Sequence, residues 1–328
     1  MNIAVIGDGA VGRLITGLLY LGHFPVKLIS RKKIAESNYF LRFPDNKTKE
    51  INAEIRQDID FVPDIVFITV KIFDLVNVCN RFNAVLKNTP LILVQNGVRA
   101  ADTVFRELQN ICLLQCILLF NVICDTSFNV RWVSGKYMVV GKVFLNCHYS
   151  FAKITRFLSR YLNITSTKDI RAKMWSKLLM NCFYNSMNVL TGQDLYSCMH
   201  NKFLRNLSIL LVKECLHLFK KNRIRFCPLP NLPKLFIYAL YYLPHFILSV
   251  FLKFKFNKKY KALQSSSLQS LLKNKKTEID YLNGEIVVLA KNIGMKNSIN
   301  QMIVELVKKQ EKSGFFYSVA QLKKLLLF

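Results

Sequence analysis

Residues 1–23 read MNIAVIGDGAVGRLITGLLYLGH, and they carry the main fold signal in the first half of the chain. The apolar run from Ile3 to Ile6 predicts a short buried strand, and the apolar residues after the glycines predict a helix to about Leu21. A further run, PVKLIS at 25–30, predicts the next strand. Strand, glycine turn, helix and strand in this order predict a doubly wound α/β domain of the Rossmann type.

The turn between the first strand and the helix carries Gly7, Gly9 and Gly12 with the spacing G-x-G-x-x-G. In this pattern the first glycine makes a tight turn, the second lets the backbone approach a pyrophosphate, and the third lets helix and strand pack closely. Backbone N–H groups at the start of the helix, at Ala10 and Val11, are available to phosphate oxygens. The sequence therefore predicts a dinucleotide site.

The residues after the second strand bear on which dinucleotide binds. An NAD site usually has an acidic residue there, which binds the ribose 2′-hydroxyl. This chain has Ser30-Arg31-Lys32-Lys33 instead. The planar guanidinium of Arg31 can hold a 2′-phosphate bidentately, so we expect NADPH as the cofactor. The alternative is that Arg31 is only a surface arginine.

Two further strands are expected to bring polar residues to the ligand edge of the sheet. DIVFITVK is predicted to end at Lys71, and PLILVQNG at Asn96-Gly97. Because ligands lie beyond the carboxyl ends of strands in open α/β sheets, Lys71 and Asn96 are candidate cofactor-binding residues. A solvated strand end and a plain turn would explain them equally well. Later strands near residues 112–120 and 136–140 are expected to complete a first domain, residues 1–170.

The second half, residues 171–328, is predicted to be an all-helical domain, and SKLLMNCFYNSMN at 176–188 is its most informative helix. At about 100° per residue, Lys177, Asn181, Asn185 and Asn188 fall within one arc of roughly 80°. Apolar residues fill most of the remaining surface. Such a helix should be largely buried, with its polar stripe facing a cleft or a partner.

Ser266 and Glu278 can serve one site only if the helix between them is broken. On one continuous helix they would lie about 18 Å apart and about 120° out of phase. The sequence TEID at 277–280 is typical of a capping box with Thr277 at the N-cap. It predicts a break at 274–276 and a new helix with Glu278 in its first turn. Glu278 could equally be no more than a favourable first-turn residue.

Charge and composition narrow the function classes. The net charge of +27 is compatible with nucleic acid or an anionic membrane. The chain lacks a long basic run and a nucleic-acid fold signature, so we interpret the charge as a solvated surface and expect no nucleic-acid partner. The uncharged run from Leu235 to Leu252 meets the minimum length of a membrane span. Because Pro244-His245 interrupts it, we expect a buried, proline-broken helical hairpin and no span.

The nine cysteines are scattered singly, and the chain opens directly on a strand-like segment. Both features favour free thiols and a cytoplasmic location. Cys147-His148 and Cys198 with His200 are too sparse to form a metal site, so we expect no metal.

Taken together, these parts resemble the ketopantoate reductase (2-dehydropantoate 2-reductase) family over nearly the whole chain. The resemblance rests on GDGAVG at 7–12, Arg31, the VK that ends at Lys71, QNG at 95–97, KLLMN at 177–181, and SSSLQ followed by KTEIDYLNGE between 265 and 285. It implies a Rossmann domain followed by a helical domain, with the active site between them. It also implies an oxidoreductase of pantothenate (vitamin B5) and coenzyme A biosynthesis, which uses NADPH to reduce 2-dehydropantoate to pantoate.

The resemblance also implies residue roles by position. Lys177 matches the family's catalytic lysine and Glu278 its active-site glutamate, while Asn181, Asn185 and Ser266 match substrate-binding positions. A desolvated lysine can protonate the alkoxide that hydride transfer to a ketone leaves behind. The polar stripe is therefore expected to face the keto acid.

Some positions depart from the family pattern and leave alternatives open. Ser270 stands where the family usually has an aspartate, and this change bears on the identity of the substrate. One alternative is a paralogue that reduces another 2-keto acid or an imino acid, and another is a non-catalytic NADP-binding sensor. A third is a basic, membrane-associated protein, based on residues 235–252 and the charge. The oligomeric state is open, and a homodimer is compatible with the sequence.

Overall fold

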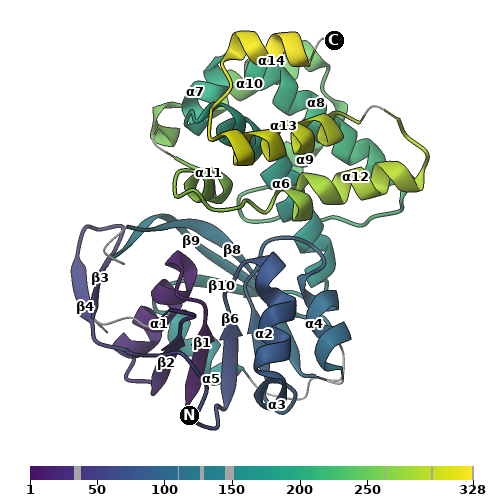
Figure 1. Ribbon diagram of the computed structural model, residues 1–328. Coiled ribbons are helices and arrows are strands. Elements are labelled where there is room, and N and C mark those ends of the chain that lie inside the picture. The colour runs from purple at the N-terminus through teal and green to yellow at the C-terminus, as the bar shows by residue number, and fades with distance from the viewer. Residues whose placement is uncertain are drawn as a thin grey trace. The chain divides into compact units, whose positions relative to one another are not determined.

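The computed structural model describes residues 1–32, 38–109, 111–125, 129–144, 151–261, 263–296 and 298–326 (Figure 1). Lys33, Cys147 and His148 lie outside these residues. The chain divides into two compact units, Met1–Ile170 and Arg171–Phe328, called unit 1 and unit 2 below.

Unit 1 is built on one sheet, which has ten strands among the described residues. The strands are β1 (Ile3–Ile6), β2 (Val26–Ile29), β3 (Tyr39–Arg42), β4 (Thr48–Ile51), β5 (Glu54–Arg56), β6 (Ile65–Ile68), β7 (Leu91–Leu93), β8 (Leu113–Cys124), β9 (Val130–Lys142) and β10 (Asn163–Ser166). Their order is β4-β3-β9-β8-β7-β6-β1-β2-β5, and β10 pairs with β9.

Six neighbouring strands, β5-β2-β1-β6-β7-β8, run parallel to one another. In chain order, the strands extend outward from β1, first to β2 and β5 on one side and then to β6, β7 and β8 on the other. The strand order thus reverses between β1 and β6, and this switch point is where doubly wound sheets bind ligands. The predicted Rossmann-type sheet is confirmed. The sequence did not predict β3, β4, β5 and β10, which are three or four residues long and carry many exposed polar residues.

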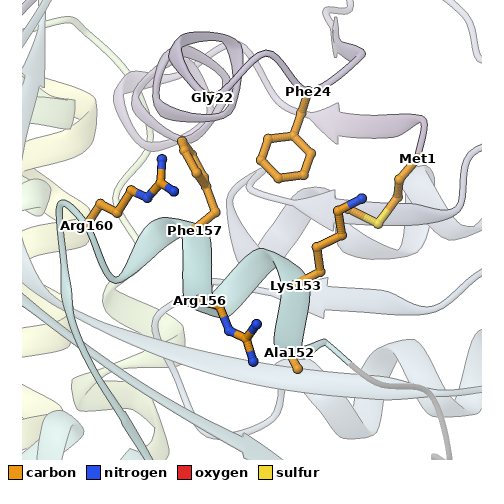
Figure 2. A pocket seen from close by; sticks show the side chains of 8 residues that line it. All are labelled: Met1, Gly22, Phe24, Ala152, Lys153, Arg156, Phe157 and Arg160. Carbon is orange, nitrogen blue, oxygen red and sulfur yellow. The ribbon is translucent and has the colours of Figure 1, made fainter.

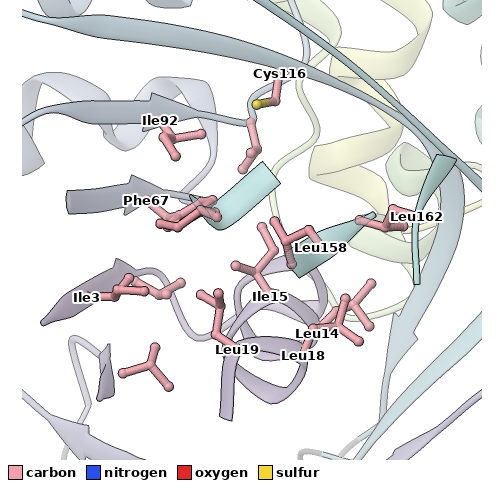
Figure 3. Close-up of a cluster of buried hydrophobic side chains, with 14 of the residues drawn as sticks. Ile3, Leu14, Ile15, Leu18, Leu19, Phe67, Ile92, Cys116, Leu158 and Leu162 are labelled. Carbon is pink, nitrogen blue, oxygen red and sulfur yellow. The ribbon is translucent and has the colours of Figure 1, made fainter. Parts of the chain in front are cut away.

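Helices cover both faces of the parallel strands, which explains their continuous apolar sequences. The helical segments of unit 1 are α1 (Ala10–Leu21), η1 (Ile72–Asp74), α2 (Leu75–Arg81), α3 (Asn83–Leu86), α4 (Ala100–Leu108) and α5 (Ala152–Leu158). On one face, Ile3 and Phe67 of the sheet pack with Leu18 of α1 and Leu158 of α5 in one buried cluster (Figure 3). Ala4 alternates with Ile3 on the strand and therefore points to the other face.

Unit 2 is helical, as predicted. Its elements are α6 (Ile170–Thr191), α7 (Leu195–His200), α8 (Lys202–Lys221), α9 (Lys234–Tyr242), α10 (His245–Lys255), η2 (Lys258–Tyr260), α11 (Ser266–Leu271), η3 (Ile279–Tyr281), α12 (Asn283–Asn292), α13 (Ile299–Ser313) and α14 (Val319–Leu325).

A buried polar chain joins four of these helices. The Asn283 side chain donates to Ser186 Oγ of α6 at 3.1 Å and to Asn300 Oδ1 of α13 at 2.8 Å. Asn300 in turn donates to Glu214 Oε1 of α8 at 2.8 Å. Since a buried polar network is stable only when its members are paired, these bonds fix the start of α12 against α6.

The apolar run at 235–252 forms the proline-broken hairpin that was predicted, with Pro244 as the N-cap of α10. The expectation that the hairpin is buried is wrong, because large apolar side chains such as Leu235 and Phe246 are 80% and 70% exposed. Within the described part of the chain, no helix has both the length and the apolar character that crossing a bilayer requires.

Of the eight described cysteines, seven are free thiols: Cys79, Cys116, Cys124, Cys182, Cys198, Cys215 and Cys227. Cys112 is disulfide-bonded, so the expectation of free thiols is wrong at that position. Spacing along the sequence does not reveal a pairing that tertiary structure creates.

Candidate functional site

The glycine turn follows β1 at the reversal point of the sheet. Thr69, at the end of β6, donates from Oγ1 to the carbonyl oxygens of Ile6 at 2.9 Å and Gly7 at 3.0 Å, which ties the turn to the neighbouring strand. Gly7 has a φ of +117°, which L side chains rarely adopt. A Cβ at Gly12 would lie 1.8 Å from the Gly7 carbonyl oxygen. Two of the three glycines are thus required by the backbone itself.

Gly9 differs from the other two because its surroundings are open. A Cβ built there meets no described atom within 4 Å, and the residue is exposed. Gly9 is also the N-cap of α1, so the first N–H groups of the helix, at Ala10 and Val11, have no partner within the helix. Open space in front of a helix N-terminus fits the pyrophosphate of a dinucleotide.

Arg31 follows β2 on the same edge of the sheet. Its side chain is 75% exposed, and its Nη1 lies 3.2 Å from Oδ1 of Asp74 in η1. Ser30 connects this segment to the glycine turn, because its Oγ donates to Asp8 Oδ2 at 2.9 Å and accepts from the Lys32 N–H at 3.1 Å. The carboxylate of Asp74 is a partner for Arg31 that the sequence did not indicate.

Lys71 and Asn96 lie beyond the ends of their strands, not within them. β6 ends at Ile68 and β7 at Leu93, so both predicted strand ends were three residues too late. The chain leaves β6 because Thr69 turns its hydroxyl back to the β1 end. Lys71 precedes η1, and Asn96 precedes Gly97, which has a φ of +93°. Both side chains are partly buried.

Gln95 connects these two loops, and the sequence did not single it out beyond its place in QNG. Its Nε2 donates to the carbonyl oxygens of Ile68 at 2.7 Å and Val70 at 3.3 Å. Its Oε1 is buried and has no hydrogen-bond partner among the described residues. The residue therefore holds the loops after β6 and β7 together and keeps one acceptor available at the ligand edge.

In unit 2, Lys177 and Asn181 lie one turn apart on α6. Burial lowers the pKa of the Lys177 ammonium from 10.5 to about 8. Within the described part of the chain, no hydrogen bond or ion pair engages this ammonium. Asn181 is 4% exposed, and its Nδ2 has no described partner either. Asn185, one turn further on, is partly buried. Because an unpaired buried donor is costly, this face of α6 is suited to a polar ligand.

Asn188 was predicted to face a ligand together with Lys177, Asn181 and Asn185. This part of the prediction is wrong, because the Asn188 side chain bonds to the backbone of its own unit. Its Nδ2 donates to the Gln193 carbonyl oxygen at 2.6 Å, and the residue is 2% exposed. The chain after α6 turns back at Gly192, with a φ of +69°, and brings that carbonyl within reach. Asn188 therefore closes the end of its own helix.

The helix is broken between Ser266 and Glu278, as predicted. Ser266 is the first residue of the short α11, and Asn274, with a φ of +51°, ends the turn that follows it. The predicted capping box is absent from the described segment, because Thr277 Oγ1 accepts from the Ile279 N–H and Asp280 pairs with Lys308 at 2.6 Å.

Glu278 consequently precedes the 3₁₀ turn η3 instead of lying in the first turn of an α-helix. It is 3% exposed. Thr277 on one side is bonded to Glu311 of α13, and Asn283 on the other side belongs to the buried polar chain to α6. The turn that carries Glu278 is therefore held on both sides by helices of the same unit.

A separate cavity of about 700 Å³ lies at the other end of the unit 1 strands (Figure 2). Met1, before β1, and Phe24, before β2, line it together with Lys153, Arg156 and Arg160. Since the glycine turn follows the carboxyl end of β1, this cavity is not the predicted dinucleotide site. The described residues gather no group of three or more His, Cys, Asp or Glu side chains that could hold a metal ion.

A doubly wound sheet with a glycine turn at its reversal point is typical of the class of dinucleotide-binding proteins. Two family models match this chain: ketopantoate reductase PanE/ApbA over residues 3–143, and its C-terminal domain over residues 169–311. The chain belongs to the ketopantoate reductase family, and it is a 2-dehydropantoate 2-reductase or a related NAD(P)-dependent reductase.

Its relatives have low sequence identity to it but match it over nearly the whole length of both chains. The 2-dehydropantoate 2-reductase of Pyrococcus abyssi is 21% identical over 322 residues, covering 95% of this chain and 98% of the relative. That of Aquifex aeolicus is 23% identical over 319 residues, covering 95% and 97%.

Solved structures share the fold. A PanE/ApbA family ketopantoate reductase from Ralstonia eutropha superimposes with a TM-score of 0.78 at 20% identity, covering 96% of this chain and 99% of that one. D-mandelate dehydrogenase with NADH and anilino(oxo)acetate gives 0.79 at 18% identity, with the same coverage. A nicotinamide dinucleotide is therefore the cofactor class that the relatives support.

Proposed function

We propose that this protein reduces 2-dehydropantoate to pantoate with NADPH, with Lys177 as the general acid. In this proposal unit 1 holds the cofactor through Gly7, Gly9, Ala10, Val11, Gly12, Arg31, Lys71 and Asn96. Unit 2 supplies Lys177, Asn181, Asn185, Ser266 and Glu278. The family assignment supports the reaction class, and the residues below support the mechanism.

One observation carries the proposal: two hydrogen-bond donors without a described partner, the Lys177 ammonium and the buried Asn181 amide, lie one turn apart on α6. The Lys177 ammonium has a pKa lowered by burial to about 8, and the Asn181 amide has no described partner. Neither group is needed to close a helix or to join two elements. Both are costly to the apo protein, which is typical of groups that act on a ligand.

The chemistry requires a proton and a stabilised oxygen. A bound nicotinamide supplies hydride to the keto carbon, and the C=O π electrons move to oxygen. Lys177 Nζ then gives its proton to that oxygen, which becomes the product hydroxyl, and solvent reprotonates the lysine. The Asn181 N–H group donates to the same oxygen and helps to orient it. A pKa near 8 leaves the lysine mostly protonated at neutral pH, yet makes it a stronger acid than an exposed lysine.

The remaining residues orient the substrate. Ser266 is partly buried at the first position of α11, where its hydroxyl and the free backbone N–H groups can bind a carboxylate. Asn185 is the next residue along the Lys177 face of α6 and offers both a donor and an acceptor. Glu278 is proposed to hold Lys177 or a substrate hydroxyl in place.

A steady-state assay tests this function. The purified chain is mixed with NADPH and ketopantoate, and the loss of NADPH absorbance is followed for the wild type, for Lys177→Ala and for Lys202→Ala. Lys202 is an exposed lysine of α8 and serves as the matched control. We expect turnover in the wild type and the control and its loss in Lys177→Ala, with NADPH binding retained. Normal turnover in Lys177→Ala would rule out the mechanism.

The mandelate dehydrogenase neighbour favours one alternative, a paralogue that acts on another 2-keto acid. A panel of branched and aromatic 2-keto acids in the same assay distinguishes it, because a paralogue gives a higher kcat/KM on another member. NADPH binding without turnover of any of them would favour the non-catalytic sensor.

A further inference from the structure

Helices α9 and α10 present an unusual number of large apolar side chains to solvent. Of the eighteen large hydrophobic residues that are exposed among the described residues, eight lie between residues 235 and 254. These eight form the α9–α10 apolar surface: Leu235, Tyr238, Tyr242, Phe246, Ile247, Val250, Phe251 and Phe254. A concentration of this kind on a folded protein marks a contact surface.

Helix α10 is apolar on two sides. Leu248 and Leu252 are fully buried against the rest of unit 2. Phe246, Val250 and Phe254, spaced four residues apart on another side, are 70%, 56% and 75% exposed. A surface helix normally carries polar residues where this one carries phenylalanine. The outward apolar row is therefore additional to what the core of unit 2 requires.

The hairpin is fixed to α8, so the outward row is not free to turn inward. Lys213 of α8 donates from Nζ to the Leu243 carbonyl oxygen at 3.0 Å, at the break between α9 and α10. Arg205 Nε donates to Ser249 Oγ at 2.9 Å, and Ser249 donates to Asn206 Oδ1 at 2.9 Å. These bonds lie on the inner side of α10.

The charged side chains in the segment that contains α9 and α10 are all those of lysine or arginine. Between Glu214 and Glu278 the chain has no aspartate or glutamate, while it has thirteen lysine and arginine residues. Two lysines lie directly at the apolar surface: Lys234 Nζ is 5.5 Å from the Tyr238 ring centroid, and Lys255 Nζ is 4.4 Å from that of Phe236. The apolar surface is thus bordered by positive charge, and residues 215–277 contain no carboxylate that could neutralise it.

We propose that the α9–α10 apolar surface docks onto an anionic lipid bilayer. Exposed aromatic and aliphatic side chains enter the headgroup region, and the surrounding lysines meet the anionic headgroups. A span is excluded by length, because an α10 of eleven residues is only about 16 Å long, against a hydrocarbon core of about 30 Å.

A second copy of the chain fits this surface less well. A symmetric dimer through α9 and α10 would bring two identical cationic borders together without a carboxylate between them, and like charges oppose such contact. The bilayer supplies the apolar phase and the opposite charge at once. This attachment is independent of the reaction proposed above.

The test is cosedimentation of the full chain with vesicles of phosphatidylcholine alone and of phosphatidylcholine with an equal amount of phosphatidylglycerol. We expect at least tenfold stronger binding to the anionic vesicles. The double variant Phe246→Ser/Phe254→Ser should lose at least tenfold of that binding. Phe315→Ser is the matched control, because Phe315 is 79% exposed outside this surface, and it should bind normally. Lys234→Glu/Lys255→Glu should lose binding most strongly at low salt.

Three results would overturn the proposal. The first is equal sedimentation of the wild type and the double phenylalanine variant while both retain the same thermal midpoint. The second is absence of binding to the anionic vesicles. The third is a concentration-dependent dimer, measured without lipid, that the phenylalanine substitutions dissociate, since the occupant would then be a second copy.

Discussion

Thr277 donates two hydrogen bonds to the same oxygen of Glu311, one from its backbone N–H at 2.7 Å and one from its hydroxyl at 2.6 Å. Glu278 is the next residue, and it is buried. A residue 34 positions along the chain, on α13, therefore sets the place of the proposed active-site glutamate. Glu311 is a positioning residue in this account.

Replacing Thr277 by valine keeps the volume and removes the hydroxyl donor. We expect a loss of roughly 1–2 kcal/mol of unfolding free energy, because a charge-assisted bond is lost in a partly buried place. We also expect a lower kcat with an unchanged NADPH Kd, because Glu278 loses its orientation. Glu305→Gln on the exposed side of α13 is the control and should change neither. A Thr277→Val enzyme with normal kcat but reduced stability would limit Thr277 to a structural role.

Lys177 should cost stability while it provides activity. Its ammonium has a pKa of about 8 in the folded chain against 10.5 as the ordinary value, so the unfolded chain binds the proton more tightly. At neutral pH this difference corresponds to roughly 3 kcal/mol. Lys177→Met should therefore raise the midpoint of urea unfolding while turnover disappears. A lower midpoint would show that the ammonium is stabilised by the fold.

The same pKa shift sets the pH dependence of stability. Between about pH 8 and 10.5 the folded chain has released the Lys177 proton and the unfolded chain still holds it, so stability gains from this group as pH rises through that window. The penalty is fully present below pH 8. Comparison of unfolding free energies of the wild type and Lys177→Met at pH 7 and pH 10 checks the sign, since the difference should shrink at the higher pH.

Activity should follow the opposite trend. As a general acid Lys177 acts only when protonated, so kcat/KM for reduction should fall as pH rises through about 8. The measurement is a pH profile of kcat/KM from pH 6 to 10 with saturating NADPH. A profile that is flat across this window would assign the proton to another group.

Asn181 and Asn188 lie on one helix and should respond differently to substitution. Asn181→Leu removes an amide that has no described partner, so we expect roughly tenfold higher KM for the keto acid and little loss of stability. Asn188→Leu removes the 2.6 Å bond to the Gln193 carbonyl and should cost roughly 1–2 kcal/mol with a smaller effect on KM. Denaturation curves and KM values for the pair separate the two roles, and equal effects on both quantities would contradict the distinction.

Cofactor preference should depend on Arg31 and Asp74 in opposite directions. Arg31→Ala removes the proposed partner of the 2′-phosphate and should lower the preference for NADPH over NADH. Asp74→Asn removes the carboxylate 3.2 Å from Arg31, which would otherwise compete with that phosphate, and should tighten NADPH binding. Direct titration with both dinucleotides measures the ratio. An Arg31→Ala ratio equal to that of the wild type would leave Arg31 as a surface residue.

Much of the fold could be predicted from local sequence, because the signals involved act between residues that are close along the chain. The apolar run, the glycines and the helix of residues 3–21 follow one another directly, and each is recognisable by period or by backbone requirement. The short polar strand β4 has no apolar pattern and pairs with β3, the strand just before it in the sequence. The strand β5 escaped prediction because it owes its state to pairing with the distant β2 and not to an apolar pattern. The strand ends at Ile68 and Leu93 likewise depend on pairing with other strands and not on an apolar pattern.

For the site, the residue types that recur on one helix face, and the position at which the helix before Glu278 breaks, could be predicted from local sequence. Only the tertiary contacts show which of these residues bond to another segment of the chain. Asn188 lies in the same arc as Asn181, but the chain that returns at Gly192 gives only Asn188 a partner. Thr277 has the sequence of a capping residue, but Glu311 offers it a charged acceptor. Helical periodicity fixes the direction of a side chain, whereas its partner depends on which distant segment packs there, and a local pattern does not encode this.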